Sequence, residues 1–388
     1  MNKRISPNFQ LLLQSVKAYT LDDSEKAVEE IIERNSIDWD DLFQRADYHC
    51  IKPQLGRLLN KISPQLIPAS IRENLREANH ENLFRQLRNV AEFFRLKQLL
   101  DEAGILAVPF KGFWIASKFY GNLADRESVD VDLLIDERDL EKVKEILLAD
   151  GFNIEEPLPQ LTNEYVVNHL CECNFDKYEN GERILHFEFH WRIHSAEFML
   201  DIKLADLQSQ VTTGIIQNRE LKVFTPSAIF LLAVMHHGGK DQFIQLKQVM
   251  DIARILKKQP NLNWEWIIKE AKRFYMENLV YIAVNLAHQL TGTEIPQPIE
   301  RHVNSRFIQR LANSRISLMN DPPSSWYGQR HEFKKNLFHF RTRNNPELKK
   351  RIVKLMIKGF ISHYIIPKNF HHYFFNRKIR VGNKTPKA

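Results

Sequence analysis

Cysteine and long apolar runs are scarce in this sequence, and each scarcity excludes a class of protein. The 388 residues include three cysteines, Cys50, Cys171 and Cys173, which are too few for a disulfide framework and fit a reducing compartment. The longest apolar run, residues 228–235, is far shorter than the roughly 20 residues that a membrane helix needs. Near the start only residues 11–13 are continuously apolar, so we expect no signal peptide. The expected location is the cytoplasm.

Charge is unevenly distributed along the chain. The formal net charge is +7. Residues 301–388 contain 20 lysines and arginines against three acids, a net of +17, so residues 1–300 carry −10. This distribution excludes a uniformly cationic, histone-like binder and assigns any contact with a polyanion to the last quarter of the chain.

Hydrophobic periodicity predicts an α+β fold: a small mixed-sheet core flanked by an N-terminal and a C-terminal helical region. The predicted regions are an N-terminal helical region over 1–104, an α/β core over 105–225, a C-terminal helical domain over 226–313, and a basic linker and tail over 314–388. Within them we expect strands at 105–110, 129–135 and 184–193, helices at 24–34, from 71, at 113–120 and 137–149, a long amphipathic stretch at 263–290, a loop or linker within 314–348, and a basic helix at 347–360.

Two aspartates, Asp130 and Asp132, stand two residues apart on the strand predicted at 129–135. Alternate residues of a strand share one face, so both carboxylates point to the same side. Neighbouring carboxylates repel unless a cation neutralises them, and a hard ion such as Mg²⁺ suits an oxygen-rich site that also accepts phosphate oxygens. Taken alone, such a pair is more often a solvated acidic strand face.

Other residues make the metal site the better interpretation. Glu188 lies on a later alternating strand and shares its face with His190, which could line the same site. If the two strands are neighbours, three carboxylates converge and can hold two metal ions for a phosphoryl displacement. At a strand-to-helix junction, Lys111 supplies a cation for a triphosphate and Gly112 permits close backbone approach, while Arg126 could clamp a phosphate.

In their order and on these elements, the motifs resemble the uncharacterised nucleotidyltransferase family of the polymerase-β-like nucleotidyltransferase superfamily. The similarity covers about residues 70–260. The segments that carry it are 108–112 (VPFKG), Arg126, 128–134 (SVDVDLL), 150–152 (DGF) and 188–192 (EFHWR), followed by His236-His237 and 246–256 (LKQVMDIARIL) in the family's helical half.

The resemblance implies a nucleotidyltransferase that joins a nucleoside monophosphate from an NTP, ATP among them, to a hydroxyl acceptor and releases pyrophosphate. Asp130 and Asp132 would coordinate Mg²⁺ with the triphosphate, and Glu188 would complete the metal site and help to activate the hydroxyl. Two Mg²⁺ ions are implied, with Mn²⁺ as an alternative. The residues implied in nucleotide binding are Lys111, Gly112, Arg126 and Ser128.

Two positions depart from the pattern of the wider superfamily. A Gly-Ser pair usually stands on the helix before the aspartate strand, whereas this sequence has Lys111-Gly112. The third carboxylate is often aspartate, whereas Glu188 is one methylene longer. Both departures affect groups that would contact the metal or the triphosphate.

Several other polar clusters favour ordinary packing. The alternating segment 169–173 (HLCEC) and the pair His190 and His194 could suggest zinc, but their spacing suits a structural zinc site poorly on predicted strands. His237, at a predicted helix end, could reach the nucleotide or acceptor, although stabilisation of the helix end is the better interpretation. For Asp251 we expect a solvated or hydrogen-bonded role within an amphipathic helix.

The basic segment 334–380 interleaves lysines and arginines with aromatic residues. It could bind RNA or an anionic headgroup surface, but a basic surface whose aromatics dock onto the acidic body is favoured. Two alternatives to an enzyme follow: an inactive nucleotide- or partner-binding relative, and an RNA-binding protein acting through this segment. The retained carboxylates favour the enzyme. The acceptor stays open among a sugar or antibiotic hydroxyl, a protein side chain and an RNA 3′ end, with the basic segment favouring an anionic one.

Overall fold

The computed structural model describes residues 5–21, 25–154, 167–168, 170–193, 201–320 and 329–364. The chain forms two compact units, the first ending at Pro322 and the second beginning at Pro323. The boundaries expected after residues 104, 225 and 313 all fall inside the first unit, and they stay predictions about its subdivision.

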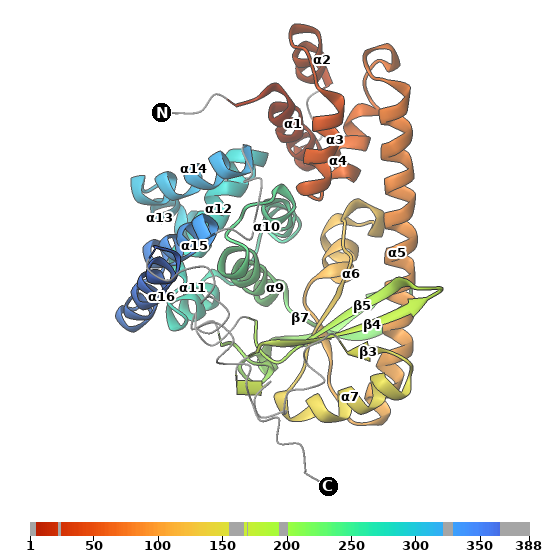
Figure 1. The fold of residues 1–388 in the computed structure, drawn as a ribbon, viewed down its shortest axis with the longest axis vertical. Helices are drawn as coiled ribbons and strands as arrows, with labels where there is room; N and C mark the ends of the chain where they lie inside the picture. The colour runs from red at the N-terminus through yellow and green to blue at the C-terminus, as the bar shows by residue number, and fades with distance from the viewer. Residues whose placement is uncertain are drawn as a thin grey trace. The chain divides into compact units, whose positions relative to one another are not determined.

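Helices fill the N-terminal part of the first unit, as the periodicity indicates. They are α1 (Pro7–Leu21), α2 (Glu25–Arg34), α3 (Trp39–Tyr48), α4 (Lys52–Leu59), the 3₁₀ turn Pro64–Leu66 and α5 (Ala69–Glu102). Figure 1 shows the long α5 running from the small helices α3 and α4 at one end to the sheet and α7 at the other. Polar residues on its buried side hold the loop before the aspartate strand: Asn82 Nδ2 donates to the carbonyl of Ala124, and Gln86 Nε2 donates to that of Ser128.

A five-stranded mixed sheet forms the core and confirms the predicted fold class. Its strands are β1 (Val108–Pro109), β2 (Val131–Leu134), β3 (Asn153–Ile154), β4 (Glu172–Glu179) and β5 (Glu182–His190), in the order β1-β2-β5-β4-β3. Strands β2 and β5 pair in parallel, and the other pairs are antiparallel. Between them lie α6 (Gly112–Ile115) with its π-helical continuation Ala116–Tyr120, the 3₁₀ turns Leu123–Asp125 and Glu137–Asp139, and α7 (Leu140–Ala149).

Alternation along β5 places its two sets of side chains on opposite faces of the sheet. Phe187 and Phe189 are fully buried on one face, whereas His186, Glu188 and His190 lie on the other. The predicted strand at 105–110 is shorter than expected, because only residues 108 and 109 pair with β2.

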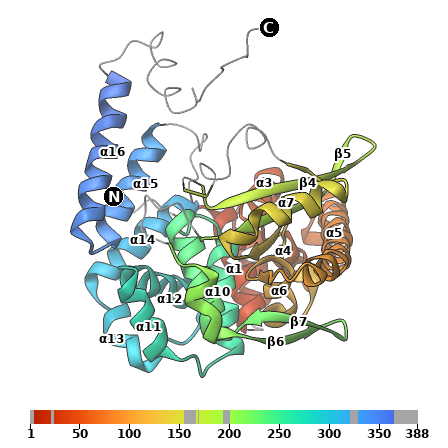
Figure 2. The ribbon, with the colours of Figure 1, turned by 90° about the horizontal axis from the view of Figure 1, so that it is seen from below.

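After the sheet, the 3₁₀ segment Leu204–Gln210 leads into a hairpin of β6 (Val211–Ile216) and β7 (Arg219–Phe224). Figure 2 shows this hairpin on the other side of α6 from β4 and β5. The contact with α6 is close, because a Cβ on Gly214 would lie 2.5 Å from the Trp114 ring.

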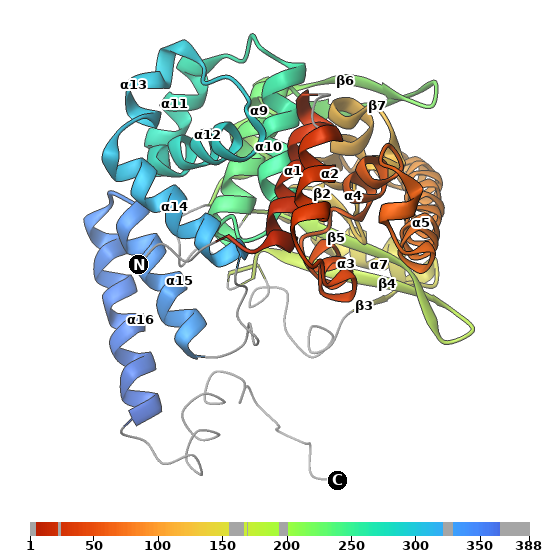
Figure 3. The ribbon, with the colours of Figure 1, turned by 90° about the horizontal axis from the view of Figure 1, so that it is seen from above.

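The rest of the first unit is helical, as expected. It comprises α9 (Pro226–Val234), the π-helical turn Met235–Lys240, α10 (Leu246–Lys258), α11 (Trp264–Arg273), α12 (Glu277–Thr291), the 3₁₀ turn Gln297–Ile299, α13 (Glu300–Val303) and α14 (Arg306–Asn320). Figure 3 shows α1 beside α10, so the N-terminal helices also contact this half. The amphipathic stretch predicted at 263–290 forms two helices, because Tyr275 has a φ of 53° and interrupts the helical backbone between α11 and α12.

The described part of the second unit is a pair of contacting helices, α15 (Gln329–Thr342) and α16 (Pro346–Tyr364). The predicted loop or linker within 314–348 is confirmed at residues 343–345, which connect α15 to α16, whereas 314–320 belongs to α14 and 329–342 to α15. The other segment on which that prediction rests, 321–325, lies outside the described residues. The predicted basic helix is confirmed as α16. No helix in the described ranges is long and apolar enough to cross a membrane.

Candidate active site

The parallel pairing of β2 with β5 brings two of the predicted carboxylates together. Asp132 and Glu188 are direct partners in the register. The ring of His190 lies against both, with Nε2 3.2 Å from Asp132 Oδ1 and 3.2 Å from Glu188 Oε2. Donor atoms of these three residues all lie within 4.8 Å of one another. The neighbouring strands that the sequence argument required are thus present, and we call Asp132, Glu188, His190 and Lys111 the carboxylate cluster.

Asp130 lies just before β2, half-buried, and its position depends on tight backbone packing. Its Oδ1 accepts a hydrogen bond of 2.8 Å from Ser128 Oγ. Gly112, with a φ of 56°, approaches so closely that a Cβ there would lie 3.1 Å from the Asp130 carbonyl oxygen. Gly112 and Ser128, both predicted to bind nucleotide, therefore shape the entry to the aspartate strand.

Lys111 precedes α6 and places its ammonium group inside the carboxylate cluster. The side chain is 6% exposed, and Nζ lies 2.6 Å from Asp132 Oδ1. Burial alone would lower the pKa of Lys111, but the charges of Asp132, Asp130 and Glu188 raise it. Burial would likewise raise the pKa of Asp132, but Lys111 and His190 together lower it. The two groups therefore stay ionised and paired at neutral pH.

Strand β4 supplies polar partners that the sequence argument missed. Glu172, Asn174 and Asp176 alternate along it, opposite His190, Glu188 and His186 in that order. Alternation of polar with buried residues was the signal that could have identified this face. The ionic contacts of this face include Glu172 Oε2 with His190 Nδ1 at 3.0 Å, Glu172 with Lys240 Nζ at 3.0 Å, and Asp176 Oδ1 with His186 Nδ1 at 2.6 Å.

Both histidines on β5 are held in the charged state. Burial lowers the pKa of His190, but Glu172, Asp132 and Glu188 raise it to about 10. Burial also opposes protonation of His186, whose Nε2 lies 3.2 Å from Glu188 Oε1, yet Glu188 and Asp176 raise its pKa to about 9. Burial would raise the pKa of Glu188, and its hydrogen bonds from the two histidines lower it instead.

The chemistry of this donor set fits a divalent cation. Asp132 and Glu188 present ionised oxygens side by side, with the half-buried Asp130 next in sequence to β2. Hard cations such as Mg²⁺ prefer carboxylate oxygens. The positive groups that balance these charges are Lys111, His186 and His190. Each of their contacts with a carboxylate involves one oxygen atom of that carboxylate. A cation can replace such single-oxygen contacts.

A second set of buried charges lies beside the first and involves Arg126. Its Nε and Nη2 each donate to one oxygen of Asp251 at 2.8 Å, and Tyr120 Oη and His237 Nε2 add bonds of 2.8 and 2.9 Å. We call Asp251, Arg126, Tyr120 and His237 the Asp251 cluster. Burial would raise the pKa of Asp251, but Arg126 and His237 hold it well below its usual range. The hydrogen-bonded role expected for Asp251 is observed.

These contacts bear on two predicted site residues. The guanidinium of Arg126 is bound to a protein carboxylate, and the ring of His237 bonds to the same group. The structure thus brings Lys111 and His190 to the carboxylates and joins Arg126 and His237 to Asp251. Roles of Arg126 in phosphate binding and of His237 at the nucleotide or acceptor stay predictions.

The described part of the suggested zinc segment supports ordinary packing. Burial, with the charge of Glu172, raises the pKa of the Cys171 thiol to about 12, so it is not a thiolate at neutral pH. Cys173 is fully buried. His169 and His194 lie outside the described residues.

The basic segment 334–380 is described only as far as residue 364. On α16, Leu348 and Ile352 are buried, whereas Val353 and Ile357 are exposed large apolar side chains. Lysines and an arginine accompany them on the same helix: Lys349, Lys350, Arg351 and Lys354. The aromatic residues between 370 and 375 lie outside the described ranges, so docking of this tail stays a prediction.

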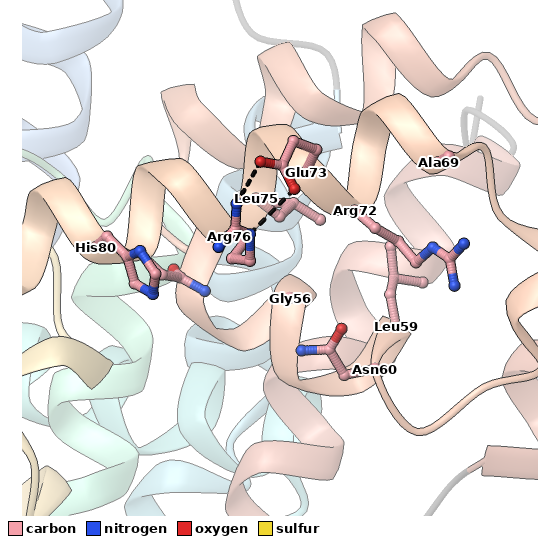
Figure 4. A pocket seen from close by; sticks show the side chains of 10 residues that line it. Gly56, Leu59, Asn60, Ala69, Arg72, Glu73, Leu75, Arg76 and His80 are labelled. Carbon is pink, nitrogen blue, oxygen red and sulfur yellow. Dashed lines mark hydrogen bonds and ion pairs between the residues drawn. The ribbon is translucent and has the colours of Figure 1, made fainter.

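A cavity of about 470 Å³ lies between α4 and the start of α5. Figure 4 shows Arg76 and Glu73 hydrogen-bonded at its wall, with Asn60 and His80 nearby. The lining residues all belong to the segments 56–60 and 69–80, and the carboxylate cluster belongs to other elements. The cavity therefore does not mark the proposed chemistry.

Comparison with known protein families identifies the family to which the chain belongs. The sequence pattern of the family described as uncharacterised nucleotidyltransferase matches residues 35–292, more than half of the chain. The chain belongs to the uncharacterised nucleotidyltransferase family, and it is a transferase of nucleotidyl groups.

Among solved structures, the chain is similar to a lincosamide antibiotic adenylyltransferase with lincomycin bound. The identity is 17%, the TM-score is 0.29, and the alignment covers 42% of this chain and 94% of that one. A similarity of this extent gives no information about the acceptor. No curated protein matches the chain.

Proposed function

We propose that this nucleotidyltransferase moves a nucleoside monophosphate from an NTP to a hydroxyl group, using a divalent cation at Asp130, Asp132 and Glu188. The observation that carries the proposal is the register of β2 with β5, which sets Asp132 beside Glu188. We place this chemistry in the core predicted over residues 105–225. Family membership supports nucleotidyl transfer as the reaction class.

In this proposal the three carboxylates hold Mg²⁺, with Mn²⁺ as an alternative, and a second ion is expected with the triphosphate. Such ions neutralise the triphosphate and stabilise the charge that develops on the leaving pyrophosphate. Lys111, whose Nζ lies 2.6 Å from Asp132 Oδ1, would bind a phosphate oxygen when Asp132 is bound to a cation. Gly112 and Ser128 keep Asp130 in place through the contacts described above.

The reaction balances without a redox partner. The acceptor oxygen forms a bond to the α-phosphorus of the NTP. The bond from that phosphorus to the oxygen that bridges the α- and β-phosphorus atoms breaks, and its electron pair leaves with pyrophosphate. The hydroxyl proton passes to a carboxylate oxygen of Glu188, which His186 and His190 hold in position.

The test is transfer of label from NTPs labelled on the α-phosphorus, each incubated with Mg²⁺ and a cell extract that supplies acceptors. We expect at least one species to be labelled by the wild type and not by the variant Asp130→Asn/Asp132→Asn. A matched control is Asp101→Asn, which removes an exposed carboxylate of α5. It should label as the wild type does.

Two results would contradict the proposal. If no NTP labels any species with the wild type alone, nucleotidyl transfer at this site is wrong. If the double variant labels as well as the wild type, the carboxylates do not carry the chemistry. Binding of RNA that depends steeply on salt and survives the double substitution would instead support the basic segment as the functional part.

A further inference from the structure

A chain of buried polar groups connects the helical half of the first unit to the carboxylate cluster. Lys111 Nζ lies 2.8 Å from His236 Nε2 as well as 2.6 Å from Asp132 Oδ1. On the far side of the ring, His236 Nδ1 lies 3.3 Å from Asp241 Oδ2. That oxygen also accepts a bond of 3.2 Å from Gln248 Nε2.

The chemistry of Lys111 determines which atom donates and which accepts in its contact with His236. A lysine ammonium has three hydrogens and no lone pair, so His236 Nε2 is the acceptor. A neutral imidazole then carries its hydrogen on Nδ1, which faces the carboxylate of Asp241. Burial, together with the charge of Lys111, lowers the pKa of His236 to about 4, in agreement with a neutral ring.

The turn that carries His236 is closely packed. A Cβ on Gly238 would lie 2.6 Å from the ring of Phe243, and the backbone N–H of Phe243 donates to the carbonyl of His237. His236 itself is 7% exposed. The ring is therefore held in place while the lysine stem, with its four rotatable bonds, can move.

His236, His237 and Asp241 are a second group whose possible ligand atoms lie close enough together, within 4.8 Å, to hold a metal ion. The tautomer that accepts from Lys111 has its hydrogen on Nδ1, the atom that would face such a metal. The ammonium of Lys111 adds a positive charge beside it. The contacts therefore favour a lysine partner over a cation at this group.

We propose that His236, supported by Asp241, is a positioning residue that draws Lys111 away from Asp132 when a cation binds and holds it for the triphosphate. This role rests on the proposed function, because it requires a cation at the carboxylates. The ammonium is shared between Asp132 and His236, so His236 lowers the cost of freeing Asp132. Without His236, Lys111 would have Asp132 as its remaining close partner and would compete more strongly with the cation.

The test is a titration with Mn²⁺ alone, followed by the loss of the free-ion signal in electron paramagnetic resonance, on the full chain. Removal of the competing ammonium in Lys111→Met should tighten Mn²⁺ binding about tenfold, which is the scale of one hydrogen bond to a charged group. His236→Leu should weaken binding several-fold. The double variant should match Lys111→Met, because His236 acts through the lysine.

His236→Gln keeps an acceptor near the position of Nε2 and should bind Mn²⁺ as the wild type does. It also guards against misfolding of the leucine variant. If His236→Leu weakens binding equally with and without Lys111, its effect is merely structural and the positioning role is wrong. The same follows if His236→Leu leaves binding unchanged, or if Mn²⁺ binding survives Asp132→Asn and is lost in His236→Leu.

The failure of the proposed function gives a different result. If the wild type binds no Mn²⁺, the cation site at the carboxylates is wrong, and the role of His236 falls with it. If the wild type binds Mn²⁺ and loses it in Asp132→Asn, the cation site is supported whatever His236→Leu shows.

Discussion

The first unit contains two buried charge clusters that differ in the geometry of their partners. In the Asp251 cluster, both oxygens of Asp251 meet the planar fork of Arg126 at 2.8 Å. In the carboxylate cluster, Asp132 meets the ammonium of Lys111 and one ring nitrogen of His190 through a single oxygen. Both aspartates are buried, so burial does not distinguish them.

The difference separates a permanent ion pair from an exchangeable one. An arginine fork fixes a carboxylate bidentately and stays charged, whereas lysine is a point charge on a flexible stem. Because Asp251 is on α10 and Arg126 precedes β2, their pair joins the helical half to the sheet. Repulsion between Asp132 and Glu188 makes the other cluster a place where a cation can replace protein partners. We infer that one cluster maintains the fold and the other carries the chemistry.

The largest expected effect is on activity and comes from Asp132→Asn. Replacing an ionised oxygen that would bind the cation should lower nucleotidyl transfer at least about a thousandfold. Its cost in folding free energy should be smaller than that of Asp251→Asn, because Lys111 keeps His236 and the repulsion with Glu188 is relieved. Initial rates with labelled NTP and urea unfolding measure the two quantities. If Asp132→Asn loses no more activity than the surface variant Asp101→Asn, the carboxylate cluster does not carry the chemistry and the distinction between the two clusters is wrong.

Asp251→Asn should have its main effect on stability. Arg126 would keep a neutral partner in a buried place, and breaking a buried pair costs about 3–5 kcal/mol. The unfolding midpoint in urea reports this loss. A variant whose stability stays within about 0.5 kcal/mol of the wild type would show that the pair does not maintain the fold.

Gly112→Ala tests the backbone contact at the entrance to the aspartate strand. The positive φ of Gly112 and the 3.1 Å approach of a Cβ to the Asp130 carbonyl predict a cost of about 1–2 kcal/mol. Transfer activity should also fall, because relief of the clash displaces Asp130. The matched control is Gly181→Ala, where φ is 83° and nothing lies within 4 Å of the new Cβ. It should lose stability without losing activity.

His49, which lies in neither cluster, predicts that the folding stability falls in acid. Burial lowers its pKa to about 3, and the ring contacts the Met319 carbonyl at 3.2 Å and accepts from the Leu246 N–H at 3.4 Å. Because the unfolded chain binds the proton near pH 6.5 and the folded chain does not, stability is present above pH 6.5 and is lost as pH falls toward 3. From pH 6.5 to 5.5 the loss due to His49 should be about 1 kcal/mol. In urea unfolding between these two pH values, the wild type should lose about 1 kcal/mol more stability than His49→Gln, in which the other histidines still titrate.

Local periodicity was sufficient to predict the parts of the site that lie on one strand. Alternation on β5 predicted the shared face of Glu188 and His190, and Asp132 is on β2 as predicted, whereas Asp130 lies just before that strand. The prediction of a shared site assumed that the strands of Asp132 and Glu188 are neighbours. Their parallel pairing joins segments more than 50 residues apart, and no local sequence pattern contains that information.

Partners that are distant in sequence could not be predicted. Arg126, just before the aspartate strand, was expected to clamp a phosphate, and that role stays a prediction. The buried partner that the structure gives it, Asp251, lies 125 residues later in the chain. Strand β4 was missed although its polar residues alternate opposite β5. The break at Tyr275 divides an amphipathic pattern that is continuous in period, so periodicity alone could not locate it.

The most direct test of the division between the clusters is the position of the cation. Crystals grown with Mn²⁺ and a non-hydrolysable NTP analogue would locate it by anomalous scattering. We predict a peak within about 2.1–2.6 Å of carboxylate oxygens of Asp132 and Glu188, the range for hard cations, with Lys111 no longer on Asp132. A peak at His236, His237 and Asp241 with none at Asp132 and Glu188 would contradict the proposed active site.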